Sequence, residues 1–172
     1  MEISSDVLLK GNKWAEALDL VKPFLPISLQ PNYTLYALSV SIGITYDKQL
    51  DIAGEEDDID SRRSVPRTVL QPHGSDLDFL FQTAILTSSL VEFKENERIS
   101  LAFDPNCEIK FNKIDFLSKF ANFGVTKILE KLSKDPVESM ENIKSFIAQT
   151  VEGFNYELDK IDDSLLDIDD LS

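Results

Sequence analysis

The stretch from Lys113 to Ser133 constrains the fold of this chain most, because its apolar residues repeat with the period of an α-helix. Steps of three and four residues place them on one face of a single long helix. The face consists of Ile114, Leu117, Ala121, Val125, Ile128 and Leu132. Such a face must be covered by other apolar surfaces, so the pattern predicts a helical domain.

Two earlier segments also show helical patterns. Asn12 to Leu25 carries apolar residues at three- and four-residue steps, which predicts an amphipathic helix with Asn12 as its cap. Tyr33 to Tyr46 is apolar on nearly every face, which predicts a helix at the centre of the domain. A strand is the alternative for this segment, since Val40, Ile42 and Ile44 alternate with small residues.

Three more helices are expected in the second half of the chain. Ser75 with Asp78 is a weak capping signal before a helix at residues 77–88, and residues 95–103 fit a short helix. Another helix should open at Pro136 and stop at Gly153. Its predicted apolar line is Met140, Ile143 and Ile147.

These patterns predict a mostly α fold, a compact domain of about five or six helices in an orthogonal or bundled arrangement with an acidic C-terminal segment. The expected division is a helical domain at 1–152 and an acidic amphipathic tail at 153–172. Residues 47–67 are predicted to be a flexible, solvated loop, because blocks of opposite charge stand side by side there. The blocks are Glu55, Glu56, Asp57, Asp58, Asp60, and then Arg62, Arg63 and Arg67, which we interpret as local charge compensation rather than a phosphate grip.

The charge balance limits the classes of partner. Of 172 residues, 31 are acidic and 17 are Lys or Arg, which gives a formal net charge of −14. A field of this sign repels nucleic-acid backbones and anionic lipid. We therefore expect basic protein surfaces as partners, with no direct nucleic acid and no membrane.

Cys107 is the only cysteine, so neither an intramolecular disulfide nor a site of several thiolates on one metal is available. The N-terminal residues lack a signal-peptide pattern, and no apolar run approaches the roughly 20 residues of a membrane span. A cytoplasmic location is the expectation.

Residues 153–172 combine helical spacing with acidic charge. Leu158, Ile161, Leu165 and Ile168 would share one stripe of a helix. Around it stand Glu157, Asp159, Asp162, Asp163, Asp167, Asp169 and Asp170. Such a segment can fold against an apolar groove with a basic rim, which makes Leu158, Ile161, Leu165, Ile168, Asp162, Asp163, Asp169 and Asp170 the predicted partner-binding residues. The alternatives are a last helix lying on its own domain and a solubilising end.

One set of residues permits a catalytic interpretation. Asp76 or Asp78, followed by Glu92 and Lys94, matches the spacing of magnesium nucleases of the PD-(D/E)xK type. That nuclease core needs a strand hairpin between the carboxylates, whereas residues 77–88 predict a helix. We therefore interpret these side chains as surface ion pairs.

The remaining reactive residues give no stronger signal. Asp104 with Glu108 and Lys110 repeats the same pattern, which lowers its power to discriminate. His73 lies in a turn and could act as a base or a metal ligand with Asp76, but a loop residue is the simpler interpretation. Cys107 has no histidine beside it and fits a small packed thiol. We expect no catalytic residue, no metal site and no cofactor.

Two stretches resemble a bacterial family: TLYALSVSIGI at Thr34 to Ile44, and FLSKFANFGVTKILEKL at Phe116 to Leu132. They are similar to small accessory proteins of DNA-modification and phage-defence operons, notably those beside DNA phosphorothioation (Dnd-type) systems. Ala37 to Gly43 and residues 120–124 correspond in position to the family's A-x-x-x-G run and its YANGG-like turn, with Phe123 in place of the usual small residue. The resemblance implies a non-catalytic subunit. Gly124 also has a packing explanation, a close approach of two helices.

Three functions remain open at this point. The first is a non-catalytic helical adaptor of a bacterial anti-phage defence or DNA-modification complex, binding a larger ATPase or nuclease subunit. The second is an acidic DNA mimic, which needs carboxylates spread along one rigid face. The third is the magnesium nuclease.

Overall fold

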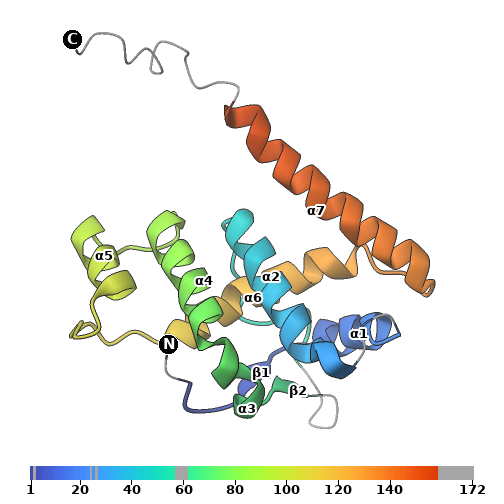
Figure 1. Cartoon of the computed structure of the whole chain (residues 1–172), viewed down its shortest axis with the longest axis horizontal. Helices are drawn as coiled ribbons and strands as arrows, with labels where there is room; N and C mark the ends of the chain where they lie inside the picture. Colours follow the sequence, from blue (N-terminus) through green and yellow to red (C-terminus); the bar gives the residue numbers. More distant parts are fainter. Residues whose placement is uncertain (2, 24, 26, 57–61, 159–172) are drawn as a thin grey trace.

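The computed structural model describes residues 1–158 except 2, 24, 26 and 57–61. Six helices of nine or more residues dominate this part of the chain (Figure 1). They are α1 (Asn12–Val21), α2 (Pro31–Thr45), α4 (Gly74–Thr87), α5 (Glu95–Phe103), α6 (Lys113–Leu129) and α7 (Pro136–Leu158). The prediction of a mostly α fold is confirmed, and the strand alternative for residues 33–46 is wrong.

Short elements complete the fold. Strands β1 (Val7–Leu9) and β2 (Arg63–Val65) pair antiparallel, with Val7 opposite Val65 and Leu9 opposite Arg63. After β2 follow the single-turn helix α3 (Arg67–Leu70) and a 3-10 turn, η3 (Gln71–His73); another 3-10 turn, η1 (Ile27–Leu29), precedes α2. Strands of three residues are too short to show a clear alternation of apolar and polar residues, so the sequence pattern did not reveal them.

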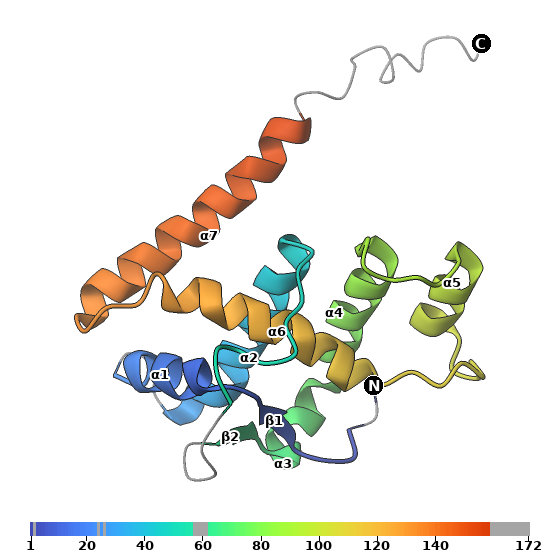
Figure 2. The same cartoon turned by 180° about the vertical axis from the view of Figure 1, so that it is seen from behind.

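Helices α2 and α6 cross at the centre of the molecule (Figures 1 and 2). Their backbones touch at two glycines. A Cβ on Gly124 would lie 1.8 Å from the carbonyl oxygen of Ser39, and a Cβ on Gly43 would lie 2.1 Å from that of Phe120. Only glycine permits this distance, which confirms the packing explanation for Gly124.

The other helices cover this crossing. The buried residues of α1 are Trp14, Ala17, Leu18 and Val21, and those of α4 include Leu77, Phe81, Ala84 and Ile85. Helix α5 packs on α4. Phe81, Phe111, Phe116 and Phe120 join α4 to α6 through tilted and edge-on ring contacts 5.2–6.0 Å apart. The single core is therefore helical and aromatic.

Helix starts follow local chemistry with two differences from the prediction. Asn112 caps α6, where its Oδ1 accepts the Asp115 N–H at 3.0 Å, and Pro31 occupies the first turn of α2. Asn12 is not a cap, because Gly11 holds that position with φ 112° and Asn12 accepts instead from the Glu55 N–H. Ser75 lies inside α4, which begins at Gly74.

Residues 47–67 differ from the predicted solvated loop. Ala53 is fully buried, and its N–H donates to the Lys10 carbonyl at 2.8 Å. The amide of Asn122 donates to the carbonyls of Leu50 and Asp51 at 3.1 and 2.9 Å. Residues 63–65 form β2. The loop prediction followed from the charged residues, but hydrogen bonds to residues distant in sequence fix both flanks of this segment. Residues 57–61 lie outside the described part of the chain.

Helix α7 continues through Gly153 to Leu158, so the predicted boundary at 152/153 falls within a helix. Both views show α7 leaving the end of α6 and running away from the other helices (Figures 1 and 2). No helix in the described ranges is long and apolar enough to cross a membrane. The acidic residues beyond 158 lie outside the described part of the chain.

Candidate functional site

The residues of the nuclease interpretation do not assemble a nuclease core. Asp76 and Asp78 lie in the first turns of α4, and Glu92 and Lys94 lie in the exposed connection between α4 and α5. The segment that would have to be a strand hairpin is helix α4 itself. The four side chains therefore lack the scaffold on which that chemistry depends.

Asp78 has a structural role. Its Oδ2 lies 2.7 Å from the amino nitrogen of Met1, and its Oδ1 lies 3.7 Å from Nζ of Lys113. The Lys113 ammonium also lies 4.5 Å from the ring centroid of Phe81. Asp78 thus ties the N-terminal segment to α4 and α6 rather than presenting a carboxylate for metal binding.

Asp76 and His73 form a second local pair. Nδ1 of His73 lies 3.1 Å from Oδ2 of Asp76, and the ring of Tyr33 stacks on the imidazole at 4.0 Å. Burial, followed by the nearby charge of Asp76, raises the pKa of Tyr33. The imidazole therefore stacks on a ring of α2 and is hydrogen-bonded to a carboxylate of α4, as expected of a structural contact.

The other candidates are also dispersed. Asp104 holds a turn by accepting the Asn106 N–H at 2.8 Å, while Glu108 and Lys110 are exposed. Cys107 is half-buried beside the core. Among the described residues, no three His, Cys, Asp or Glu side chains are grouped closely enough to hold a metal ion.

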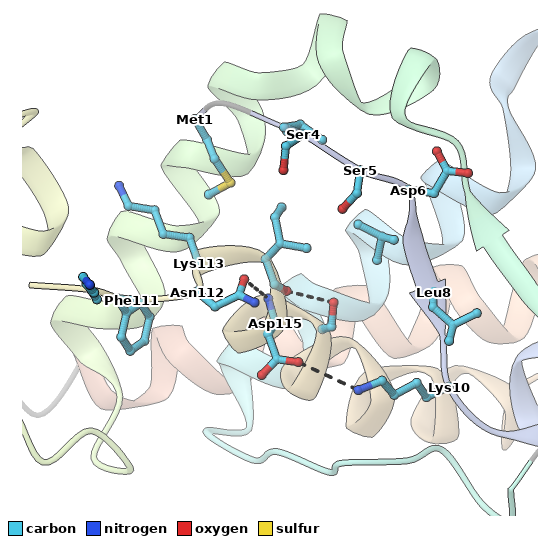
Figure 3. Close-up of a pocket in the computed structure, with 15 residues that line it drawn as sticks. Met1, Ser4, Ser5, Asp6, Leu8, Lys10, Phe111, Asn112, Lys113 and Asp115 are labelled. Atoms are coloured by element: carbon cyan, nitrogen blue, oxygen red, sulfur yellow. Dashed lines mark hydrogen bonds and ion pairs between the residues drawn. The ribbon is translucent and has the colours of Figure 1, made fainter.

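A groove of about 920 Å³ lies between the N-terminal segment with β1 and the first turns of α6 (Figure 3). Its charged groups are largely engaged within the fold. Lys10 lies 3.9 Å from Asp115, and Lys113 pairs with Asp78. Ser118 donates to the Ile114 carbonyl. The groove therefore lacks a set of converging polar groups for a small ligand.

Elsewhere in the molecule, Asp47 fastens the end of α2 to the connection after α4. Its carboxylate accepts hydrogen bonds from the Ser88 hydroxyl and from the hydroxyl and N–H of Ser89, at 2.5–2.9 Å. Burial opposes ionisation of Asp47, but these bonds and the charge of Arg98 outweigh it, and its pKa lies below the usual value. Arg98 in turn donates to the carbonyls of Ser88, Val91 and Phe93.

Beside Asp47 lies a feature that we call the lysine–aromatic cluster: Tyr46, Phe123, Phe146, Lys48, Lys127 and Lys131. The Tyr46 ring lies 5.8 Å from that of Phe123 and 6.5 Å from that of Phe146. Each lysine Nζ stands 5.5–6.0 Å from one of the two phenylalanine rings. The segments 46–48, 123–131 and 146 meet only in the fold. The one local indication of the cluster in the sequence is Lys127, which follows Phe123 by four residues.

Helix α7 has two different sides. Ser139 is buried, and Ile143, Phe146 and Thr150 are half-buried toward the domain. Val137, Met140 and Ile147 are 66%, 46% and 40% exposed, and we call them the outer face of α7. The predicted line of Met140, Ile143 and Ile147 is therefore divided between the two sides. Ser139 also fixes the base of the helix through hydrogen bonds with Ser133.

The predicted partner-binding residues lie at or beyond the end of the described chain. Leu158 ends α7, and Ile161, Asp162, Asp163, Leu165, Ile168, Asp169 and Asp170 lie outside the described residues. Their predicted role therefore stays a prediction. In the sequence, apolar residues continue after Ile147 as Val151, Phe154 and Leu158, at steps of four, three and four.

Comparison with known proteins gives no relative for this chain: no family model, no curated protein and no solved structure matches it.

Proposed function

We propose that this chain is a non-catalytic binding subunit whose α7 helix, together with residues 159–172, docks on a larger protein. The observation that carries the proposal is the outer face of α7. Val137, Met140 and Ile147 are exposed along this helix, while its other side packs on the domain as far as Phe146. An amphipathic helix of this kind fits an apolar groove on a partner.

The sequence extends that face with the same spacing. Leu158, Ile161, Leu165 and Ile168 follow Phe154 at steps of three and four residues. The acidic residues among them select a groove with a basic rim. Apolar anchors supply the affinity, while the carboxylates mainly accelerate the encounter.

The larger setting is proposed on the resemblance of residues 34–44 and 116–132. It is a cytoplasmic anti-phage defence or DNA-modification complex in which the partner is an ATPase or nuclease subunit. The residues that carry the resemblance include Gly43 and Gly124, at the crossing of α2 and α6. They support this setting as a shared helical scaffold, not as a shared active site.

The experiment is affinity capture from the native host, with the full chain compared against two double variants. Met140→Ser with Ile147→Ser alters the outer face of α7. Phe79→Ser with Phe103→Ser alters two residues of α4 and α5 that are 67% and 61% exposed. A partner lost with the first pair and kept with the second supports the proposal, and each α7 anchor should contribute more than about 1 kcal/mol to binding.

Equal capture by the wild type and the α7 variant would overturn docking through this face. The identity of the captured protein tests the setting separately. An ATPase or nuclease encoded beside the gene supports a defence complex, and a partner without connection to DNA modification or defence contradicts it.

A further inference from the structure

Two lysines of the lysine–aromatic cluster lack an acidic partner among the residues that the structure describes. Within the described residues, Lys48 and Lys131 make no ion pair, although acidic residues outnumber Lys and Arg by 31 to 17. Their ammonium groups stand 5.8 Å from the Phe123 centroid and 5.5 Å from the Phe146 centroid. The third lysine, Lys127, is paired with Glu130 at 2.8 Å.

Apolar surface lies beside these charges. A hollow of about 410 Å³ is bounded by Lys48, Leu50, Leu90 and Phe123, among others. Leu50 and Leu90 are 38% and 49% exposed, and Tyr46 is 41% exposed. The cluster thus combines unpaired cations with open apolar side chains, which suits an acidic segment that carries aliphatic anchors.

The carboxylates near the hollow do not neutralise Lys48 and Lys131. Asp47 faces it, but its oxygens are occupied by Ser88 and Ser89. Glu130 is engaged by Lys127. Lys48 and Lys131 are therefore the groups that an incoming carboxylate would meet.

We infer that residues 159–172 of the same chain dock on the lysine–aromatic cluster. This segment holds six aspartates, a single lysine and five Ile or Leu residues. It follows directly on α7, whose Phe146 belongs to the cluster. From Phe146 to Leu158 the helix rises about 18 Å. Fourteen further residues span up to about 46 Å when extended, so the segment reaches back to the cluster within one molecule.

This contact would hide Leu165 and Ile168 from a partner. A partner's groove must therefore compete with the lysine–aromatic cluster for this segment. The regulatory meaning rests on the proposed function, but the contact itself does not, because it involves this chain alone.

The test uses the full-length chain with a nitroxide spin label on Ser164→Cys in a Cys107→Ser background, which leaves every aliphatic anchor of the segment intact. Amide signals of Lys48, Leu50, Phe123 and Lys131 should lose most of their intensity at low salt and recover it at high salt. Lys48→Glu with Lys131→Glu should also restore them. The control Lys22→Glu with Lys110→Glu makes the same change in net charge away from the cluster and should leave the loss intact.

Three results would overturn the inference. The first is that the amide signals keep the same intensity whether the nitroxide is paramagnetic or reduced. The second is broadening that maps to another surface, such as the groove of Figure 3. The third is broadening that persists in a mixture of isotope-labelled chain without nitroxide and spin-labelled chain without isotope, because this would place the contact between two copies. No partner takes part in this experiment, so its failure leaves the proposed function standing, and failure of the capture experiment leaves this contact standing.

Discussion

Trp14 and Asn122, 108 residues apart, are joined by a buried hydrogen bond in which the indole Nε1 donates to Oδ1 at 2.9 Å. The amide nitrogen of the same asparagine donates to the carbonyls of Leu50 and Asp51. One side chain on α6 therefore holds α1 and the segment after α2 in place.

Asn122→Ala should be strongly destabilising, because it leaves the indole N–H and two carbonyls without this partner. We expect a loss on the order of 3 kcal/mol in the free energy of unfolding, measured by urea denaturation. Trp14→Phe removes the buried donor. In the Asn122→Ala, Trp14→Phe double variant the loss should therefore be smaller than the sum of the single losses. Strict additivity would contradict an energetic coupling between Trp14 and Asn122.

The crossing of α2 and α6 gives a second prediction. Gly124→Ala should destabilise the fold by about 3 kcal/mol or more, although alanine is the better helix former, because its methyl group would overlap the Ser39 carbonyl. Gly74→Ala should cost less, since the one close atom there, the Met1 carbonyl oxygen, would lie 2.9 Å from the Cβ instead of 1.8 Å and belongs to the first residue of the chain. A more stable Gly124→Ala variant in thermal unfolding would show that the helices can separate at little cost.

Leu117 and Leu38 lie on the two central helices but differ in burial. Leu117 is fully buried, whereas Leu38 is half-buried at the edge of the core. Leu117→Ala should cost about 2 to 5 kcal/mol, and Leu38→Ala clearly less. Chemical denaturation of both variants checks the order, and equal losses would mean that the core extends past Leu38.

Asp47 predicts a specific dependence of stability on pH. Its pKa in the folded chain is lowered, so its contribution is complete above the unfolded pKa of about 3.9 and is lost as the pH falls through the lower folded value. Asp47→Asn keeps a residue that tolerates the φ of 47° but removes the charge. The variant should be less stable than the wild type at neutral pH, and the gap should narrow toward pH 3.

The exposed change Glu16→Gln serves as the reference for this measurement, since it removes one negative charge from the surface of α1. The free energy of unfolding of the wild type and of Asp47→Asn could instead change in parallel with pH across the acid range. That result would contradict the assigned role of the Ser88 and Ser89 hydrogen bonds.

Residues 157–172 allow the apolar and acidic contributions to partner binding to be separated. Leu165→Ala and Ile168→Ala should each weaken binding of the captured partner by more than about 1 kcal/mol, mainly through faster dissociation. Neutralising Asp162, Asp163, Asp169 and Asp170 should mainly slow association and reduce its salt dependence. Surface-based kinetics resolves the two effects, and equal affinity for the full chain and a chain ending at Gly153 would exclude docking by this segment.

Helical periodicity was sufficient to locate the long helices, because each carries its own apolar face. It failed where the determinant is distant in sequence. Nothing local marks Leu50 as a partner of Asn122, and the acidic residues after Ala53 indicate a solvated loop. The lysine–aromatic cluster was missed for the same reason, since Tyr46, Phe123 and Phe146 meet only after folding.

The attachment of α7 through its first half also has a mechanical consequence. Its 23 residues make a rod about 34 Å long that is fastened near Ser133 and Ser139 and packs on the domain as far as Phe146. A tilt of about ten degrees at that joint displaces the far end by about 6 Å for such a length. A protein bound to the far end of α7 would keep the helical domain at a distance. A small change in the hydrogen bonds between Ser133 and Ser139 would then change the orientation of that domain relative to the partner.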